Sequence, residues 1–185
     1  MSRHEPRHAL RVGVGLDMHR LVSGRPLTLG GVSIPFPRGL EGDSDADVLT
    51  HAILDALLGA CGEGDIGSQF GVGRPETRGI SSLVLLKQVV TLVAAKGYRP
   101  SNVDATVLAE APRIGPHILA MRERLSAVLQ IPLDCVNVKG TTAKGLGWVG
   151  AGEGIAAIAV ASVTPVPAGP LAVSPHRTRR AHVKK

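Results

Sequence analysis

The sequence predicts a single domain of the α/β or α+β class, with helices packed on one sheet. The first observation is composition: 44% of the 185 residues are hydrophobic, which is enough for one real core. The second is the alternation of strand-like and helix-like segments, with no internal repeat and no second core. Because only 2% of the residues are aromatic, the core has to consist of Leu, Val, Ile and Ala.

The strands are predicted from short apolar runs that end at glycine, proline or polar residues. The run at 102–110 alternates, which places Val103, Ala105 and Val107 on one face. The other extended segments are expected at 9–16, at 25–36 with a Gly-Gly turn inside, at 135–142 and at 154–163.

Three helices are predicted from apolar residues at helical spacing. The first lies within 42–59, and Ser44 or Asp45 is its expected N-cap. The second begins with a serine and ends at Lys96 and Gly97, which are typical of a helix C-terminus. The third helix and a glycine-rich loop are expected at about 116–129 and at 62–79.

The basic character of the chain comes from its C-terminal end. The formal net charge of +6 would fit a nucleic-acid-binding protein if it were spread over the domain. Residues 164–185 hold five Arg or Lys and no acid, however, which leaves sixteen basic and fifteen acidic residues in 1–163. We predict a nearly neutral domain at 11–163, a flexible N-terminus at 1–10 and a disordered basic tail at 164–185, with no nucleic acid as partner.

The sequence indicates a cytoplasmic protein without a membrane partner. Residues 1–10 lack the apolar core of a secretory signal, and the longest apolar stretch is broken by Lys87 and Gln88. Cys61 and Cys135 are too few for a disulfide framework or a cysteine metal site. A reducing compartment is therefore the simpler expectation.

The stretch GDSDADVLTHAILDALLG, residues 42–59, carries much acid for a core-facing helix. Asp47, His51 and Asp55 stand at i, i+4 and i+8, so they would share one helix face. This face suits a metal-bound histidine with carboxylates that orient it or tie down the surrounding loops. It equally suits a capped helix with an ordinary solvated face.

A second acidic group and histidine occur in GLDMHRL, residues 15–21. Asp17 and His19 stand at i and i+2 at the end of the first predicted strand, so both side chains point to the same face. With His51 they make the three-ligand set that a catalytic zinc uses. A chance match or a local hydrogen bond is the alternative for the Asp-x-His pair.

Six segments together resemble the 2-C-methyl-D-erythritol 2,4-cyclodiphosphate synthase family of the non-mevalonate isoprenoid pathway. They run from about Arg11 to Val163 in the family's order and spacing: GLDMHRL, SDADVLTHAILDALLGA, GDIG, AEAPRIGPHI, VNVKGTT and GLGWVGAGEGIA. The resemblance implies an α+β fold (an α/β sandwich) with helices on one face of a mixed sheet. It also implies a homotrimer whose three sheets line a central prism, with active sites between neighbouring subunits.

The resemblance assigns roles to individual residues. It implies that Asp17, His19 and His51 bind a zinc ion. It places Thr142 and Asp43 at positions that stabilise the transition state, and it implies a second divalent cation, Mg²⁺ or Mn²⁺. The residues that would contact the cytidine diphosphate-linked substrate are Asp17, His19, Asp43, Ser44, Asp65, Ile66, Gly67, Phe70, Arg74, Ala109, Ala111, Pro112, Arg113, Gly115, Thr141, Thr142, Lys144 and Trp148.

Some of these residues have simpler interpretations. Asp65 before Ile66-Gly67 could close a turn, and Arg113 could be a surface charge. The glycine run at 145–154 is not a dinucleotide fingerprint, because a strand rather than a helix is expected after it.

The implied reaction is an intramolecular phosphoryl transfer. The 2-phosphate of 4-diphosphocytidyl-2-C-methyl-D-erythritol 2-phosphate attacks the β-phosphorus, and CMP leaves with formation of 2-C-methyl-D-erythritol 2,4-cyclodiphosphate. Because the substrate supplies the nucleophile, the expected enzyme, a phosphorus-oxygen lyase, works by positioning and charge neutralisation.

The sequence also departs from the family pattern at charged positions. Asp43 replaces a histidine, Lys144 stands where an acid binds the second cation, and Ala151 replaces an arginine of the central cavity. Val72 and Arg74 replace acids of a substrate loop. An active synthase with rearranged charges is the favoured hypothesis. The alternatives are an impaired trimer that binds zinc and a cytidine nucleotide, and a zinc enzyme for another diphosphate ester.

Overall fold

The structure, a computed structural model, describes residues 9–71 and 79–166. Five strands form the main sheet in the order β4-β1-β7-β5-β6, and two short strands form a hairpin. The strands are β1 (Arg11–Ser23), β2 (Leu27–Leu29), β3 (Val32–Ile34), β4 (Arg38–Leu40), β5 (Tyr98–Leu108), β6 (Val136–Thr141) and β7 (Gly154–Pro165). The helices are α1 (Val48–Cys61), α2 (Ile66–Phe70), α3 (Ser82–Ala95), η2 (Gly115–His117), α4 (Ile118–Leu129), η3 (Leu133–Cys135) and α5 (Gly147–Gly150).

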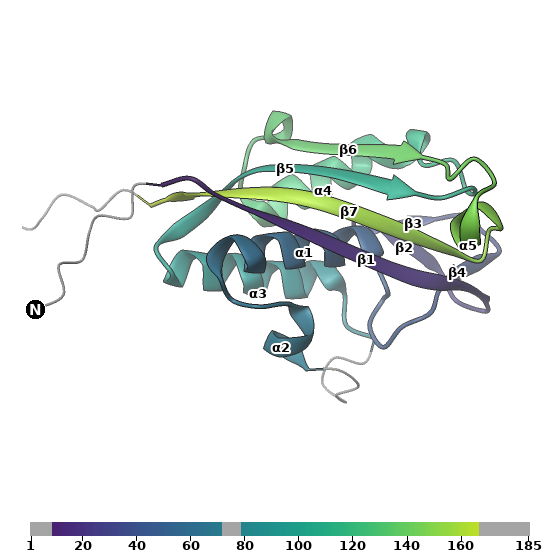
Figure 1. Cartoon of the computed structure of the whole chain (residues 1–185), viewed down its shortest axis with the longest axis horizontal. Helices are drawn as coiled ribbons and strands as arrows, with labels where there is room; N and C mark the ends of the chain where they lie inside the picture. Colours follow the sequence, from purple (N-terminus) through teal and green to yellow (C-terminus); the bar gives the residue numbers. More distant parts are fainter. Residues whose placement is uncertain (1–8, 72–78, 167–185) are drawn as a thin grey trace, which may run out of the picture.

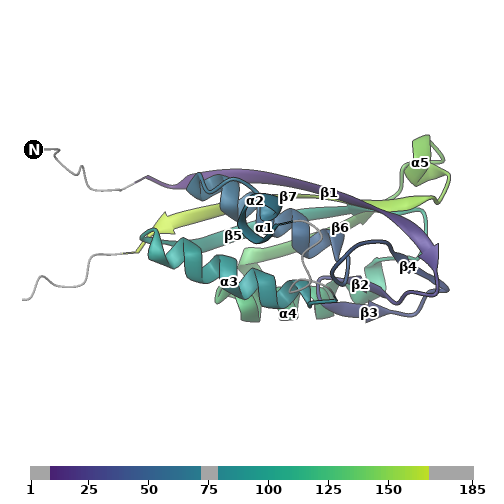
Figure 2. The same cartoon turned by 90° about the horizontal axis from the view of Figure 1, so that it is seen from below.

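The main sheet is mixed. β5 and β6 run parallel, whereas β1 pairs antiparallel with β4 and β7, and β7 pairs antiparallel with β5. Helices α1, α3 and α4 lie together on one face of this sheet (Figure 1), and the view from below shows the same layering (Figure 2). This arrangement confirms the predicted α+β fold with helices on one face of a mixed sheet.

The core lies between the sheet and these helices. Val103, Ala105 and Val107 of β5 are buried, as their alternation predicted. α1 is buried along almost all of its length, because it lies between the sheet and α3.

Two glycines of β1 set the position of α1. A Cβ atom at Gly13 would collide with the backbone carbonyl of Ala56, and one at Gly15 would collide with the carbonyl of Ala52. Small residues on both sides thus let the strand and the helix backbones touch. This contact fixes which turn of α1 faces which residue of β1.

The first and last strands are longer than the sequence predicted. β1 continues to Ser23, because β7 supplies antiparallel partners from Arg11 through Arg20 and β4 supplies them from Leu21 through Ser23. Asp17 and His19 therefore lie inside the strand rather than at its end. β7 likewise continues past 163 to Pro165, where it pairs with the start of β5.

The start of the first helix also differs from the prediction. α1 begins at Val48, and its N-cap is Asp47 rather than Ser44 or Asp45. The Asp47 carboxylate accepts a hydrogen bond from the Thr50 backbone N–H at 3.0 Å, which is the usual capping contact.

The sheet face opposite the helices is strongly apolar and exposed. Along β1 and β7, residues that alternate with the buried ones carry large hydrophobic side chains. They are Val12, Val14, Leu16, Met18, Ile158 and Val160, each between 40% and 61% exposed. In the described ranges, no helix is both long and apolar enough to cross a bilayer.

Candidate active site

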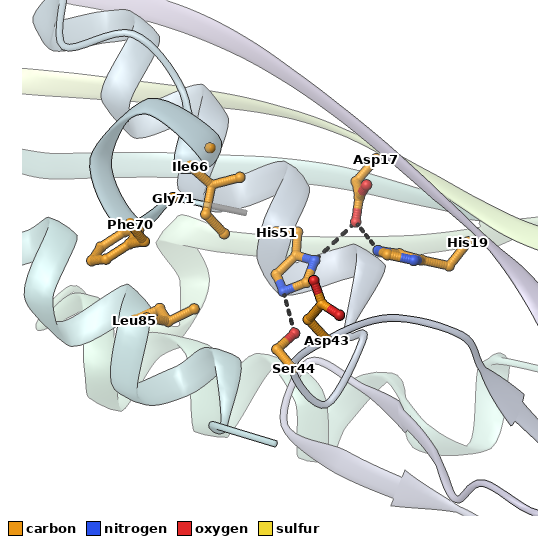
Figure 3. A pocket seen from close by; sticks show the side chains of 10 residues that line it. Asp17, His19, Asp43, Ser44, His51, Ile66, Phe70, Gly71 and Leu85 are labelled. Carbon is orange, nitrogen blue, oxygen red and sulfur yellow. Dashed lines mark hydrogen bonds and ion pairs between the residues drawn. The ribbon is translucent and has the colours of Figure 1, made fainter. Parts of the chain in front are cut away.

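Asp17, His19 and His51 form one cluster in the structure. Asp17 Oδ2 lies 3.1 Å from His19 Nε2 and 3.0 Å from His51 Nδ1. One ligand atom from each residue lies within 4.8 Å of the other two. Figure 3 shows the three side chains pointing toward one another, with Asp43 and Ser44 on the neighbouring loop. Two imidazole nitrogens and one carboxylate oxygen converging in this way fit a zinc ion with an open coordination position.

The close packing of β1 on α1 explains this convergence. Gly13, Gly15, Asp17 and His19 alternate along β1 and so point to the same side of the sheet, toward α1. Gly15 lies against the turn of α1 at Ala52. Asp17 is the next residue of β1 on the same face, and it therefore lies beside His51, the residue before Ala52.

The charges in the cluster stabilise one another. Burial alone would raise the pKa of Asp17, but the hydrogen bonds from His19 and His51 outweigh it and hold that pKa far below its usual range. Burial alone would lower the pKa of His19, but the hydrogen bond with Asp17 raises it above its ordinary value. The carboxylate is thus ionised at neutral pH and available as a metal ligand.

The two acids on the His51 helix tie down loops. The fully buried Asp47 carboxylate accepts from the backbone N–H groups of Gly30 (2.9 Å) and Gly31 (2.7 Å), in the turn between β2 and β3. Asp55 accepts from the Ile66 backbone N–H at 2.8 Å, at the start of α2. The loop-anchoring role, one of the two considered for these acids, is therefore the one that the contacts support.

His51 has a different set of partners, which sequence reasoning missed. Its Nε2 lies 2.8 Å from Ser82 Oγ and 3.3 Å from Ser44 Oγ. Ser82 is also hydrogen-bonded to the Asp45 carboxylate. The only sequence signal for Ser82 was its place at the start of a predicted helix, which says nothing about a histidine 31 residues away.

A pocket opens beside the cluster and gathers part of the predicted substrate site. Asp17, His19 and His51 line it together with five predicted residues and Leu85, which was not predicted. The five are Asp43, Ser44, Ile66, Gly67 and Phe70. Arg74 and Val72, which belong to the same predicted loop, lie outside the described residues.

Asp65 is held as a helix cap at the edge of this region. Its carboxylate accepts from the Ser68 backbone N–H at 2.7 Å, and Ser68 Oγ accepts from the Asp65 N–H at 3.0 Å. This hydrogen bonding lowers the pKa of Asp65. The loop expected at 62–79 therefore contains a short helix, α2, and the turn-closing interpretation of Asp65 describes its contacts within this chain.

A separate pocket gathers the other predicted substrate residues. It is lined by residues from 109–116, by Ile118 and by 140–142, and the predicted residues among them are Ala109, Pro112, Arg113, Gly115, Thr141 and Thr142. The Ala109 N–H donates to the Thr141 carbonyl at 3.0 Å, which holds the two segments side by side. Ala111, between lining residues, is exposed. Trp148 lies apart from them, against Met18, His19 and Arg20.

The described residues that depart from the family pattern are all exposed. Asp43, Lys144 and Ala151 each lie at the surface. Lys144 adopts a left-handed backbone with φ of 56°, and its N–H donates to Thr142 Oγ1 at 3.4 Å.

Known proteins share both the sequence and the fold. The model of the YgbB family matches residues 10–164. The 2-C-methyl-D-erythritol 2,4-cyclodiphosphate synthase of Symbiobacterium thermophilum is 58% identical over 152 residues, which cover 82% of this chain and 97% of that protein.

Two solved structures with bound CDP have the same fold. IspF of Plasmodium falciparum in complex with CDP is 33% identical, with a TM-score of 0.75 over 85% of this chain and 97% of that one. A cyclodiphosphate synthase in its CDP-bound form is 38% identical, with a TM-score of 0.76 over 83% and 99% of the two chains. With a family model that matches residues 10–164 and a relative more than half identical, this chain belongs to the YgbB family.

Proposed function

We propose that this protein converts 4-diphosphocytidyl-2-C-methyl-D-erythritol 2-phosphate to 2-C-methyl-D-erythritol 2,4-cyclodiphosphate and CMP, in isoprenoid precursor biosynthesis. The observation that carries the proposal is the cluster of Asp17, His19 and His51 at the mouth of a pocket, in a chain of the YgbB family. Relatives that share more than half of the sequence are synthases of this product.

The reaction needs no nucleophile from the protein. A 2-phosphate oxygen forms a bond to the β-phosphorus while the bond from that phosphorus to the α-phosphate oxygen breaks, and CMP carries the leaving oxygen. Asp17, His19 and His51 would hold a zinc ion, which when bound supplies a Lewis acid at a diphosphate oxygen. The chain has to hold the two phosphates in line and neutralise their charge.

Several side chains are suited to those tasks. In the metal pocket, Ser44 can donate its hydroxyl to a phosphate oxygen. In the second pocket, Thr142 and Thr141 can do the same, and the ammonium group of Lys144, two residues after Thr142, can supply positive charge directly. Asp43 beside the metal cluster is the candidate ligand for a second cation, Mg²⁺ or Mn²⁺, because the acid that usually binds it is replaced by Lys144.

The cytidine moiety is assigned to the pocket between 109–115 and 140–142. Two structures of the same fold carry CDP, which supports a cytidine nucleotide as part of the ligand. Ala109 and Pro112 offer backbone groups and apolar walls on one side of this pocket, and Arg113 offers a cation.

We propose that the chain forms the homotrimer that the family resemblance implies, and two observations support association of subunits. First, the apolar outer face of β1 and β7 is too large to suit a monomer in water. Second, the metal residues and the cytidine residues line different pockets of one chain. Assembly through this face would cover the apolar side chains, and a neighbour could bring its second pocket to the first metal pocket.

The direct test is to incubate the purified protein with the family substrate, zinc and magnesium, and to follow phosphorus NMR. Cyclic diphosphate together with CMP supports the proposal. Binding without turnover would instead support the impaired trimer, and hydrolysis without cyclisation would support a different diphosphate chemistry. The His51→Ala variant, which should lack the metal, is the control for enzyme-dependent product.

A further inference from the structure

The two ring nitrogens of His51 have different surroundings. Nδ1 faces Asp17 Oδ2 at 3.0 Å, on the side of the metal cluster. Nε2 faces Ser82 Oγ at 2.8 Å, and Ser82 Oγ is hydrogen-bonded in turn to Asp45 Oδ1. We propose that Ser82 and Asp45 are positioning residues that fix the tautomer and orientation of His51 for the metal.

The donors available decide the direction of each hydrogen bond. An ionised carboxylate can only accept, so the single hydroxyl proton of Ser82 goes to Asp45. Ser82 Oγ then accepts from His51, which places the ring hydrogen on Nε2. When zinc is bound, Nδ1 gives its lone pair to the metal in place of its contact with Asp17, while the Nε2–H stays on Ser82 Oγ.

The surroundings hold this chain of hydrogen bonds rigid. The second oxygen of Asp45 accepts from the Ser82 backbone N–H at 2.9 Å, so one carboxylate holds both polar groups of the serine. The Asp45 N–H donates to the Ile80 carbonyl at 3.1 Å, which holds the backbone of Asp45, and Asp45 Oδ1 also accepts from the Asp47 N–H at 3.3 Å, which helps to hold the carboxylate. Ser82 is completely buried, so water does not compete for its hydroxyl group.

Ser44 is the only other described hydroxyl within hydrogen-bonding distance of this nitrogen, and its contact is weaker. Ser44 Oγ lies 3.3 Å from Nε2 and also accepts from the Ala46 N–H at 3.2 Å. Ser44 is half-buried and lines the pocket, where a substrate can compete for it. Ser82 is thus the partner that holds His51 whether or not substrate is bound.

The first test is the Ser82→Ala variant, which keeps the backbone cap and removes only the hydroxyl group. Zinc affinity, measured by competition with a chromogenic chelator, should fall by about 10- to 100-fold. The matched control is Ser81→Ala, because Ser81 is exposed and its side chain makes no capping hydrogen bond. An affinity for Ser82→Ala within twofold of wild type would overturn the proposal.

The second test is the nearly isosteric Asp45→Asn variant. The Ser82 N–H cannot turn, so the amide oxygen should stay on it and the amide NH₂ should face the Ser82 hydroxyl. That hydroxyl would then rotate and donate to His51 Nε2, which would have to accept and could carry no proton. Zinc affinity should fall about tenfold or more, and nitrogen-15 NMR of the His51 ring in the metal-free protein should show that Nε2 has lost its proton. An Nε2 that keeps its proton in Asp45→Asn would contradict the proposed hydrogen-bond direction.

The double variant separates positioning from a general loss of stability. If Asp45 acts on His51 through Ser82, then Ser82→Ala with Asp45→Asn should bind zinc no more weakly than Ser82→Ala alone. Additive losses in zinc affinity would overturn the proposed chain of hydrogen bonds from Asp45 through Ser82 to His51.

This inference rests on the metal-binding residues of the proposed function, but different results would overturn the two proposals. A wild-type protein that binds no zinc would contradict both the proposed zinc site and the positioning role of Ser82. Tight zinc binding that Ser82→Ala does not weaken would contradict only the positioning role.

Discussion

The metal pocket and the cytidine pocket are built in opposite ways. In the metal pocket, His51 and Asp17 are fixed by side-chain hydrogen bonds that reach α1, α3 and the loop before α1. In the pocket proposed for cytidine, the residues at 140–142 and 109–115 are exposed or half-buried except for Ala109 and Ile114, and a backbone hydrogen bond joins the two segments. One chain therefore brings the three metal-ligating side chains together by itself, whereas the pocket proposed for cytidine is open enough to take part in the proposed subunit contact.

The same contrast explains where the charges have changed. Asp43, Lys144 and Ala151, which depart from the family pattern, are exposed. A charged residue at an exposed position costs little folding free energy. Asp43 lines the metal pocket but is exposed, whereas Asp17 and His51 are hydrogen-bonded to each other, so replacement of one leaves the other without its partner.

The largest expected effect is that of His51→Ala. Removal of one of three ligands should abolish most zinc binding and all turnover, measured by metal analysis of the purified protein and by CMP release. His117→Ala, outside both pocket linings, is the matched control and should keep its zinc. Full zinc occupancy in His51→Ala would contradict the assignment of His51 as a zinc ligand.

A second comparison uses two aspartate N-caps that differ in burial. Asp47→Ala would leave the buried N–H groups of Gly30 and Thr50 and the half-buried one of Gly31 without their acceptor, and the loss in free energy of unfolding should be about 3 kcal/mol or more. Asp65→Ala, at the exposed start of α2, should change the urea midpoint very little. Equal shifts of the urea midpoint in the two variants would show that burial does not determine how much an N-cap contributes to stability in this protein.

Local patterns predicted the parts of the fold that depend on near neighbours. The range of α3, the buried face of β5 and the shared side of Asp17 and His19 all follow from residue spacing. The roles of Ser82 and Asp45 do not, because they arise from contacts between residues 31 to 37 positions apart. The length of β1 was also missed, since its partner strand lies at the other end of the domain.

Asp43 lines the metal pocket and Lys144 follows Thr142 of the second pocket by two residues, and together they offer a test of charge exchange. We expect the single reversions Asp43→His and Lys144→Glu each to lower cyclase activity roughly tenfold or more, because each disturbs the charge around the diphosphate. The double reversion should recover activity, since coupled neighbours are not additive. Additive losses, or four inactive proteins, would rule the exchange out.

The pH dependence should differ between metal-free and zinc-loaded protein. His19 has a raised pKa in the folded state through its hydrogen bond with Asp17, against the effect of burial. Its contribution to stability is thus fully present below the unfolded pKa and is lost as pH rises through the folded pKa. Zinc must displace that proton, so zinc affinity should rise with pH, by up to about tenfold per unit for each proton displaced. We would measure melting temperatures from pH 5.5 to 8.5. The contribution of His19 to the melting temperature should fall with pH without zinc and rise with pH with zinc. Parallel pH dependences would contradict the assignment of His19 as a zinc ligand.

The smallest expected effect is that of removing the basic tail. The Val166 N–H still donates to the Gly97 carbonyl at 2.9 Å, and Thr164 and Pro165 pair with Arg99 and Tyr98. Truncation after 163 should therefore lower the melting temperature by a few degrees, whereas truncation after 166 should leave it unchanged. Both proteins should keep the mass of a trimer in light scattering, because the apolar face of β1 and β7 is intact in each. A monomer after truncation at 166 would show that the tail, and not this face alone, holds the subunits together.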